Sequence, residues 1–199
     1  MTVHLGPGVT LEGFDPLRAE DVASMRDMFT DYLLEEFDRI GELAFGAPIG
    51  DHLAGTFIRY DGADAGFMSV DVGRMAVEVI YVVPAHRGKG LARMALEETN
   101  QSCPQTLALK TPLSPGGEAL ANRLGLRLAH NFPHEEAKNQ EFLQLMREQV
   151  KQACPHGKRP GDPRKPCPRC YRKALRRYAA AGMAKHVNPV RTRAGLPPV

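Results

Sequence analysis

A run from Val82 to Ala92 most constrains how this chain can fold. Its sequence is VVPAHRGKGLA, in which a basic, Gly-rich segment separates two apolar ones. Residues 75–83 form an apolar run rich in β-branched side chains and interrupted by Glu78, which is typical of a strand covered on both faces. The residues that follow have helical spacing, with Leu91 and Ala95 on one side. The pattern therefore predicts a buried strand, a tight turn and a helix.

The turn between these two elements has the properties of an anion-binding site. The first backbone N–H groups of a helix are unpaired and lie at the positive end of its dipole, where phosphate is the usual ligand. Gly88 and Gly90 let a ligand approach the backbone closely, and Arg87 and Lys89 add positive charge. The segment is neither a P-loop nor a dinucleotide-binding fingerprint, because the GK[ST] and the third glycine are absent. An ordinary turn with solvated basic side chains is the alternative.

The spacing Arg87-x-x-Gly90-x-Ala92, preceded by an apolar strand and Pro84, resembles the pyrophosphate-binding motif of the GNAT superfamily of N-acetyltransferases. The resemblance covers about residues 9–133 and implies an α/β fold with a mixed, mostly antiparallel sheet flanked by helices. It also implies that the chain binds acetyl-CoA and transfers the acetyl group to an amine, which the sequence does not identify. The residues that the resemblance assigns to the cofactor are Val82, Val83, Arg87, Gly88, Lys89, Gly90, Leu91, Ala92 and Ser114.

Hydrophobic patterning predicts the other elements of this region and divides the chain. Further strands are expected at 9–14, 53–60, 66–72, 106–110 and 126–130, and helices at 21–40 and 115–124. We expect a GNAT-like domain at 1–133, a connecting helix at 134–153, a zinc-binding basic module at 154–187 and a Pro-rich basic tail at 188–199. The apolar face expected for the connecting helix consists of Phe142, Leu145, Met146 and Val150.

Glu78 is the candidate catalytic residue. A carboxylate within an apolar strand is costly unless it has a partner or a chemical role. An amine must lose a proton before it attacks a thioester, and the resemblance implies that a Glu on this strand removes that proton, often through water. A backbone N–H near Val82 would polarise the thioester carbonyl. The alternative is a structural Glu78 that faces solvent or pairs with a neighbouring Arg.

The chain departs from the family pattern after the next strand. Many members have Asn, Ala and Tyr where this chain has Ser114, Gly117 and Ala121, and the Tyr often donates a proton to the leaving CoA thiolate. Ala121 has no proton to donate. Strict alternation along the strand places Tyr81 on the opposite face from Glu78, so Tyr81 is a poor replacement. The missing Tyr favours a second hypothesis, a binding or structural protein that has lost catalysis and keeps the fold, with or without the CoA site. In that case the basic zinc module contacts a nucleic acid or a protein assembly.

The last quarter of the chain has a different charge balance. Residues 151–199 contain thirteen Lys and Arg and a single acidic residue, Asp162, for a net charge of +12. The whole chain has a net charge of +3, so residues 1–150 carry −9. This separation suggests a polyanionic partner for residues 151–199, either a nucleic acid or an acidic protein. Docking on the chain's own acidic domain or on another subunit is the alternative.

Three of the four cysteines lie in this basic segment together with a histidine. Two closely spaced ligand pairs across a ten-residue loop are typical of a ribbon-like structural zinc site. The four candidate ligands are Cys154, His156, Cys167 and Cys170. A redox pair and free thiols are the alternatives, and His134 or His186 could replace His156. The segment has few apolar residues, so we expect it to need the metal to fold and to have a core separate from the preceding domain.

The rest of the basic segment is expected to be partly helical. The pattern of residues 171–185 predicts a basic helix with Leu175, Tyr178 and Ala179 on its apolar face. Residues 188–199 are Pro-rich and basic, which predicts a segment that is extended or disordered unless a partner holds it. No stretch is apolar enough to span a membrane, and the N-terminus lacks a secretory signature. We therefore expect a cytoplasmic protein, in which reduced thiols favour a metal over a disulfide. The sequence leaves the oligomeric state open.

Overall fold

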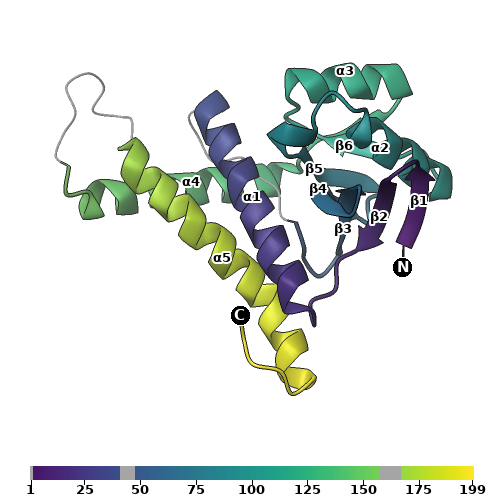
Figure 1. Ribbon diagram of the computed structural model, residues 1–199. Helices are drawn as coiled ribbons and strands as arrows, with labels where there is room; N and C mark the ends of the chain where they lie inside the picture. Colours follow the sequence, from purple (N-terminus) through teal and green to yellow (C-terminus); the bar gives the residue numbers. More distant parts are fainter. Residues whose placement is uncertain (1, 41–47, 157–166) are drawn as a thin grey trace.

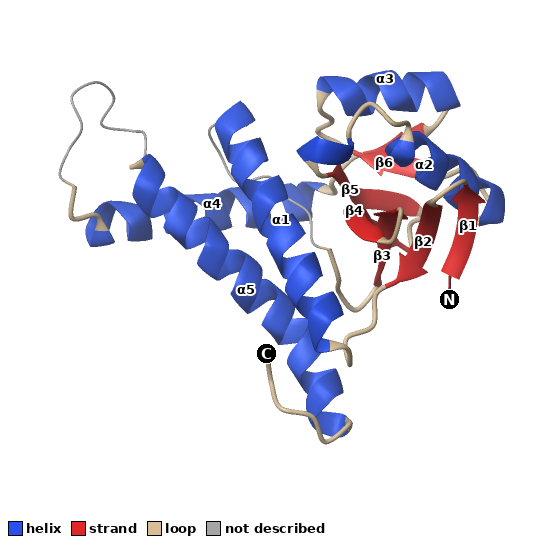
Figure 2. Cartoon of the chain, in the orientation of Figure 1, coloured by secondary structure: helices blue, strands red, loops and turns tan. Residues whose placement is uncertain are grey.

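One seven-stranded sheet forms the centre of the structure, a computed structural model that describes residues 2–40, 48–156 and 167–199. Its strands lie in chain order (Figure 2). They are β1 Thr2–Gly6, β2 Val9–Gly13, β3 Leu53–Tyr60, β4 Ala63–Asp71, β5 Ala76–Val82, β6 Ala108–Lys110 and β7 Arg127–Ala129. Neighbours from β1 to β5 are antiparallel, whereas β5, β6 and β7 run parallel. This mixed, mostly antiparallel sheet confirms the predicted fold class.

Helices cover both faces of the sheet (Figure 1). The helical elements are α1 Ala19–Ile40, the 3-10 turn η1 Pro84–His86, α2 Leu91–Ser102, α3 Pro115–Leu124, α4 Pro133–Ala153 and α5 Pro168–Arg193. Helix α1 packs on one face, where its apolar side chains contact Phe57 and Phe67 of the sheet. Helices α2 and α3 cover the other face, where Leu96 and Ala121 pack against Met68. Among the described helices, none combines the length and apolar character needed to cross a bilayer.

The predicted elements differ from the observed ones mainly at the two ends of the chain. Strand β1 was not predicted, because its short run shows only exposed and half-buried positions. The expectation of an extended segment at 188–199 is wrong for its first half, since α5 continues to Arg193 and includes Pro189. Proline removes one helical hydrogen bond. The helix nevertheless continues, because Val187 and Arg191 on either side of Pro189 are buried.

Helix α1 lies between the sheet and α5. Helix α5 runs beside α1 (Figure 1) and buries a stripe of side chains at every fourth position. The stripe consists of Tyr171, Leu175, Ala179, Met183 and Val187. These residues join the same hydrophobic cluster as the α1 and sheet side chains. The expectation of two separate cores is therefore wrong, and the basic helix is docked on the acidic domain.

Helix α4 connects the sheet to α5 and is also part of this cluster. Its buried side chains are Leu143 and Val150. Leu145 is 56% exposed, so its predicted place on the apolar face is wrong, whereas Val150 lies where it was expected. The side chains of Phe142 and Met146 lie outside the described part of the helix.

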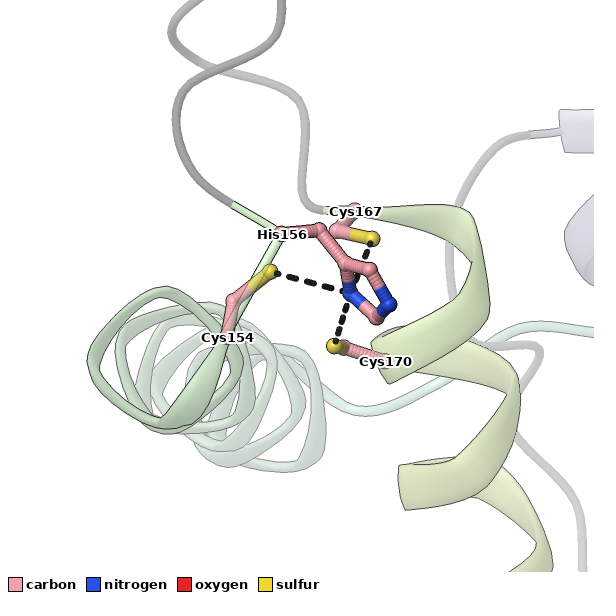
Figure 3. Close-up of side chains that lie close together, drawn as sticks. All are labelled: Cys154, His156, Cys167 and Cys170. Atoms are coloured by element: carbon pink, nitrogen blue, oxygen red, sulfur yellow. Dashed lines mark hydrogen bonds between the residues drawn. The ribbon is translucent and has the colours of Figure 1, made fainter.

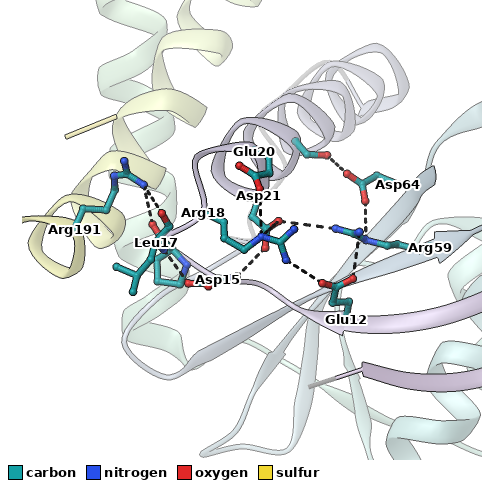
Figure 4. Close-up of polar contacts among 11 residues, drawn as sticks. Glu12, Asp15, Leu17, Arg18, Glu20, Asp21, Arg59, Asp64 and Arg191 are labelled. Atoms are coloured by element: carbon teal, nitrogen blue, oxygen red, sulfur yellow. Dashed lines mark hydrogen bonds and ion pairs between the residues drawn. The ribbon is translucent and has the colours of Figure 1, made fainter. Parts of the chain in front are cut away.

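Polar contacts hold the start of α1 against the end of α5 (Figure 4). The Arg191 side chain is 5% exposed and donates hydrogen bonds to the carbonyl oxygens of Leu17, at 3.0 Å, and Pro197, at 2.8 Å. In the first turn of α1, the buried Asp21 accepts a hydrogen bond from the backbone N–H of Asp15 at 3.1 Å. In both contacts a side chain forms hydrogen bonds with backbone groups that lie outside the helices.

Shortening a side chain between α1 and α5 should destabilise the whole protein. We expect Leu175→Ala to lower the free energy of unfolding by about 2–5 kcal/mol, because Leu175 is fully buried and the substitution leaves a cavity. The matched control Leu145→Ala, at an exposed position of α4, should change it by less than about 0.5 kcal/mol. Urea unfolding curves measure both effects. Equal, small effects of the two substitutions would contradict the packing of α5 on α1.

Candidate active site and metal cluster

Strands β5 and β6 are paired only where they begin. The register joins Ala76 to Ala108 and Val77 to Leu109, and no further pairs follow among the described residues. Strand β5 continues beside β4 as far as Val82. The edge of β5 that faces β6 is therefore not paired with β6 from Glu78 to Val82 in the described part of the chain, so its backbone N–H groups have no partner from that strand.

A β-bulge places Glu78 at the point where the two strands separate. Ser69 of β4 pairs with Val79 and Val70 pairs with Val77, so Glu78 is the extra residue. The bulge interrupts the alternation of side chains. Val79 and Tyr81 belong to the cluster under α1, whereas Val77 belongs to the cluster under α2 and α3.

A cavity of about 640 Å³ fills the opening between β5 and β6. This volume is within the usual range for small-molecule sites. The cavity is lined by the open part of β5, the end of β6, the C-terminal half of α1 and the N-terminal ends of α2 and α3. The polar side chains that line it are Tyr32, Glu35, Glu36, Asp38, Arg39, Glu78, Tyr81, Arg87, Lys110 and Ser114. Glu78 and Tyr81 thus reach the same cavity, and the expectation from strict alternation is wrong because of the bulge.

The turn before α2 has a backbone conformation that depends on its two glycines. Gly88 and Gly90 have φ angles of 77° and 76°, in the left-handed region that favours glycine. Gly90 is the N-cap of α2, and no side chain caps this helix end. A Cβ at Gly88 would meet nothing within 4 Å, and one at Gly90 would meet only the Arg93 side chain at 4.0 Å. The space in front of the first turn of α2 is open, as an anion site at a helix N-terminus requires.

The basic side chains of the turn point in different directions. Arg87 turns toward the cavity, donating to the Val82 carbonyl oxygen at 2.8 Å and to Glu35 Oε2 at 2.6 Å. Lys89 lies over the Tyr60 ring, 4.1 Å from its centroid, on the side away from the cavity lining. Of the residues assigned to the cofactor, Val82, Arg87, Ala92 and Ser114 line the cavity. Val83, Gly88, Lys89 and Gly90 belong to the adjoining turn, and Leu91 is the buried first residue of α2.

Glu78 has a partner within the cavity. The Lys110 ammonium lies 2.5 Å from Glu78 Oε1, and the two side chains are only 13% and 12% exposed respectively. Glu78 therefore pairs with a Lys on the adjacent strand, and not with a neighbouring Arg as the alternative from the sequence expected. The ion pair fixes the carboxylate at the mouth of the gap between β5 and β6.

Two tyrosine hydroxyls of the cavity remain protonated at neutral pH. Burial raises the pKa of Tyr32 well above its usual range, with smaller contributions from the carboxylates of Glu36 and Glu78. Burial and then the hydrogen bond to Glu35 raise the pKa of Tyr81 in the same way. The Tyr81 hydroxyl donates to Glu35 Oε1 at 2.8 Å. Both hydroxyls can therefore donate hydrogen bonds at neutral pH.

Helix α3 begins and ends at the residues predicted for it. Ser114 is its N-cap, and the Ser114 Oγ accepts a hydrogen bond from the Gly117 N–H at 3.2 Å. Ala121 is a buried residue of this helix and contributes no polar group to the cavity. The tyrosines that line the cavity come instead from α1 and β5.

The contribution of α1 to the cavity was not predicted from the sequence. The cavity residues of this helix follow the i, i+3, i+4, i+7 spacing of one helix face, adjacent to its buried apolar face; they are Tyr32, Glu35, Glu36 and Arg39. A polar stripe of this kind is the signal that could have revealed them. Lys110 could have been found at the end of β6, since residues at neighbouring ends of parallel strands lie close together.

A second site lies where α4 ends and α5 begins (Figure 3). The four predicted metal ligands converge there, with one ligand atom from each residue within 4.8 Å of all the others. Cys154 follows the last residue of α4, Cys167 is the N-cap of α5 and Cys170 lies in its first turn. The flanking elements are helices rather than the strands of a β-ribbon. His186 is placed elsewhere, 3.4 Å from Asp51, and the His134 side chain lies outside the described residues.

The donor set and its spacing fit a zinc ion. The His156 Nδ1 lies 3.8, 3.6 and 3.4 Å from the Sγ atoms of Cys154, Cys167 and Cys170. Zinc bonds of about 2.3 Å to sulfur and about 2.0 Å to nitrogen give a nitrogen–sulfur separation of about 3.6 Å in a tetrahedron. The N–H of Cys170 lowers the pKa of the Cys167 thiol, which favours the thiolate that a metal binds. One imidazole and three sulfurs therefore form a donor set that suits structural zinc.

Comparison with known proteins matches the middle of the chain to one family. The family described as "Acetyltransferase (GNAT) family" matches residues 14–112. A solved structure described as "RimL- Ribosomal L7/L12 alpha-N-protein acetyltransferase crystal form 2 (apo)" is similar, with a TM-score of 0.41 and 11% identity. That match covers 62% of this chain and 80% of the other, and likeness at this level says nothing about ligands. None of the curated proteins matches the chain.

Proposed function

Residues 14–112 form a domain of the acetyltransferase (GNAT) family, and from this premise we propose that the protein transfers the acetyl group of acetyl-CoA to an amine. The observation that carries the proposal is the cavity at the open edge of β5. It brings together the uncapped N-terminus of α2, an unpaired strand edge and a carboxylate. A thioester, its pyrophosphate and an acceptor amine each require one of these features.

The turn from Arg87 to Ala92 is the proposed site of the CoA pyrophosphate. The open space in front of Gly88 and Gly90 leaves room for the phosphates against the backbone N–H groups at the start of α2. The pantetheine arm would then lie along the open edge of β5, where Val82 ends the strand. Ser114, at the N-terminus of α3, faces the same cavity from the opposite side. Bound acetyl-CoA supplies an activated acyl group and a thiolate that can leave.

Glu78 is the proposed general base. An ammonium has no lone pair with which to attack a carbonyl, so the acceptor must first lose a proton. Glu78 lies in the bulge at the start of the open strand edge and can accept this proton directly or through a water molecule. Its ion pair with Lys110 holds the carboxylate in one position. A backbone N–H near Val82 would stabilise the negative charge that develops on the acyl oxygen.

The second candidate function is a binding protein that keeps the fold without catalysis. The observation that favours it is Ala121, which is buried and cannot protonate a leaving thiolate. The acetyltransferase remains the better-supported proposal. A CoA thiolate leaves readily without an acid, so the missing Tyr does not prevent acetyl transfer.

A substitution in the turn should abolish cofactor binding. Gly90→Glu places bulk and negative charge where the pyrophosphate is proposed to lie, so isothermal calorimetry should detect no acetyl-CoA binding. Gly62→Glu is the matched control, because Gly62 has a φ of 78°, open surroundings and a place in the distant β3–β4 turn. Equal affinities of wild type and Gly90→Glu would contradict the pyrophosphate site. Failure of wild type to bind at millimolar acetyl-CoA would favour the second candidate function.

Replacing the proposed base should slow turnover without weakening cofactor binding. We expect Glu78→Gln to lower kcat by roughly 100-fold or more while the acetyl-CoA affinity stays nearly unchanged. Glu36→Gln is the control, since Glu36 is another cavity carboxylate paired with a basic side chain, Arg39. Steady-state kinetics with a panel of small amines measures both variants. Turnover of Glu78→Gln at the wild-type rate would assign Glu78 a structural role.

We further propose that Cys154, His156, Cys167 and Cys170 hold one structural zinc ion. The ion would join the end of α4 to the start of α5, because each helix supplies ligands at its terminus. All four candidate positions are then occupied by protein atoms, which is typical of structural rather than catalytic zinc. The site therefore holds a helix in place and performs no step of the transfer.

The metal is tested by elemental analysis. The purified protein should contain about one zinc ion per chain, and Cys170→Ser should lose most of it. We expect this variant to unfold at a temperature lower by roughly 5–10 °C, and hydrogen exchange should rise in the first turns of α5 and in the facing end of α1. Cys103→Ser, at a thiol outside the cluster, should keep its zinc. Protein purified under reducing conditions without chelator and found free of metal would refute the site.

A further inference from the structure

The outward side of α5 carries a row of cations that the fold leaves unneutralised. Helical spacing places this side opposite the buried stripe that begins at Tyr171 and Leu175. The exposed residues that define the basic face are Arg169, Lys173, Arg176 and Arg177. No acidic residue occurs between Pro168 and Arg193. In the part of the chain that the structure describes, no carboxylate pairs with these four side chains, whereas the neighbouring Arg172 pairs with Asp38 at 2.6 Å.

These charges are unfavourable for the helix that carries them. Cations near a helix N-terminus oppose its dipole, and the first turn of α5 contains no acidic residue to compensate. Lys173 is four residues from both Arg169 and Arg177, and like charges at this spacing destabilise a helix by about 0.2–0.5 kcal/mol per pair. Helix stability therefore does not account for the basic face.

The basic face is presented in a fixed orientation. Tyr171 is buried against Phe37 of α1, with ring centroids 4.5 Å apart, and Arg172 is tied to the same helix through Asp38. The face extends over nine residues, from Arg169 to Arg177, or about 12 Å of helix axis. Each strand of a duplex carries one phosphate per about 3.4 Å of duplex axis, so three or four phosphates of one strand fall within this axial length. The carboxylates on the surface of a folded protein are scattered and rarely lie as close together as these phosphates.

We propose that the basic face of α5 binds the phosphodiester backbone of a nucleic acid. Three of its four residues are arginines, whose planar donors fit phosphate oxygens in pairs. The only aromatic side chain beside the face that the structure describes is Tyr178, which is half-buried, so the site lacks a stacking platform for bases. Binding is therefore governed by phosphates, depends weakly on base sequence and weakens steeply with salt. The proposal is independent of acetyl transfer.

Fluorescence anisotropy with the full-length, zinc-loaded protein tests the proposal. The probes are a labelled 20-nucleotide RNA and a labelled 20-base-pair DNA duplex, titrated at 50, 100 and 200 mM KCl. We expect the double variant Lys173→Gln/Arg176→Gln to bind at least about 10-fold more weakly at 100 mM. The slope of log K against log salt should become shallower by about 1.5, since two phosphate contacts are lost.

The matched control removes two exposed cations elsewhere. Arg123→Gln/Lys185→Gln, in α3 and in the second half of α5, should change affinity by less than twofold. Equal losses in both double variants would overturn the proposal, because net charge alone would then explain binding. Absence of binding at 50 mM KCl, or binding insensitive to salt, would also overturn it. If polyglutamate competes as effectively as RNA of equal charge, the proposal is also overturned, and the partner is an acidic protein instead of a nucleic acid.

Discussion

The separation of β5 from β6 after two residue pairs is the constraint on which the rest of the site depends. Two parallel strands that stayed paired would cover the backbone of β5 and leave no room for a ligand. The bulge at Glu78 marks the place where pairing ends and shifts the following side chains by one position. As a result one cavity receives both the carboxylate of Glu78 and the hydroxyl of Tyr81.

The second constraint is that α1 is packed on two sides. Its apolar side chains contact the sheet on one side and α5 on the other, and all of them belong to one cluster. Removing either neighbour would expose apolar side chains of α1 to water, which is unfavourable. The C-terminal basic segment is therefore part of the acetyltransferase-like core rather than an appended arm. The polarised charge of the chain is partly explained by this docking, as the Arg172–Asp38 pair illustrates.

The sequence was most informative where local chemistry decides structure. The glycines at 88 and 90 indicated a tight turn with an accessible backbone, and β3 and α3 were predicted with their observed bounds because polar turns and caps delimit them. Cys154, His156, Cys167 and Cys170 could be grouped because metal ligands follow characteristic spacings. The bulge at Glu78 and the docking of α5 were not foreseen. Both depend on contacts between distant segments, which alternation and helical periodicity do not encode.

The cysteine cluster and the cavity are linked through the C-terminal end of α1. Asp38 and Arg39 line the cavity, and Phe37 and Asp38 contact Tyr171 and Arg172 in the second turn of α5. These two α5 residues directly follow Cys170, one of the candidate zinc ligands. Closely packed side chains transmit displacement, because the interior of a protein has little free volume. Whatever fixes the first turn of α5 therefore also fixes the wall of the cavity that faces the carboxylate of Glu78.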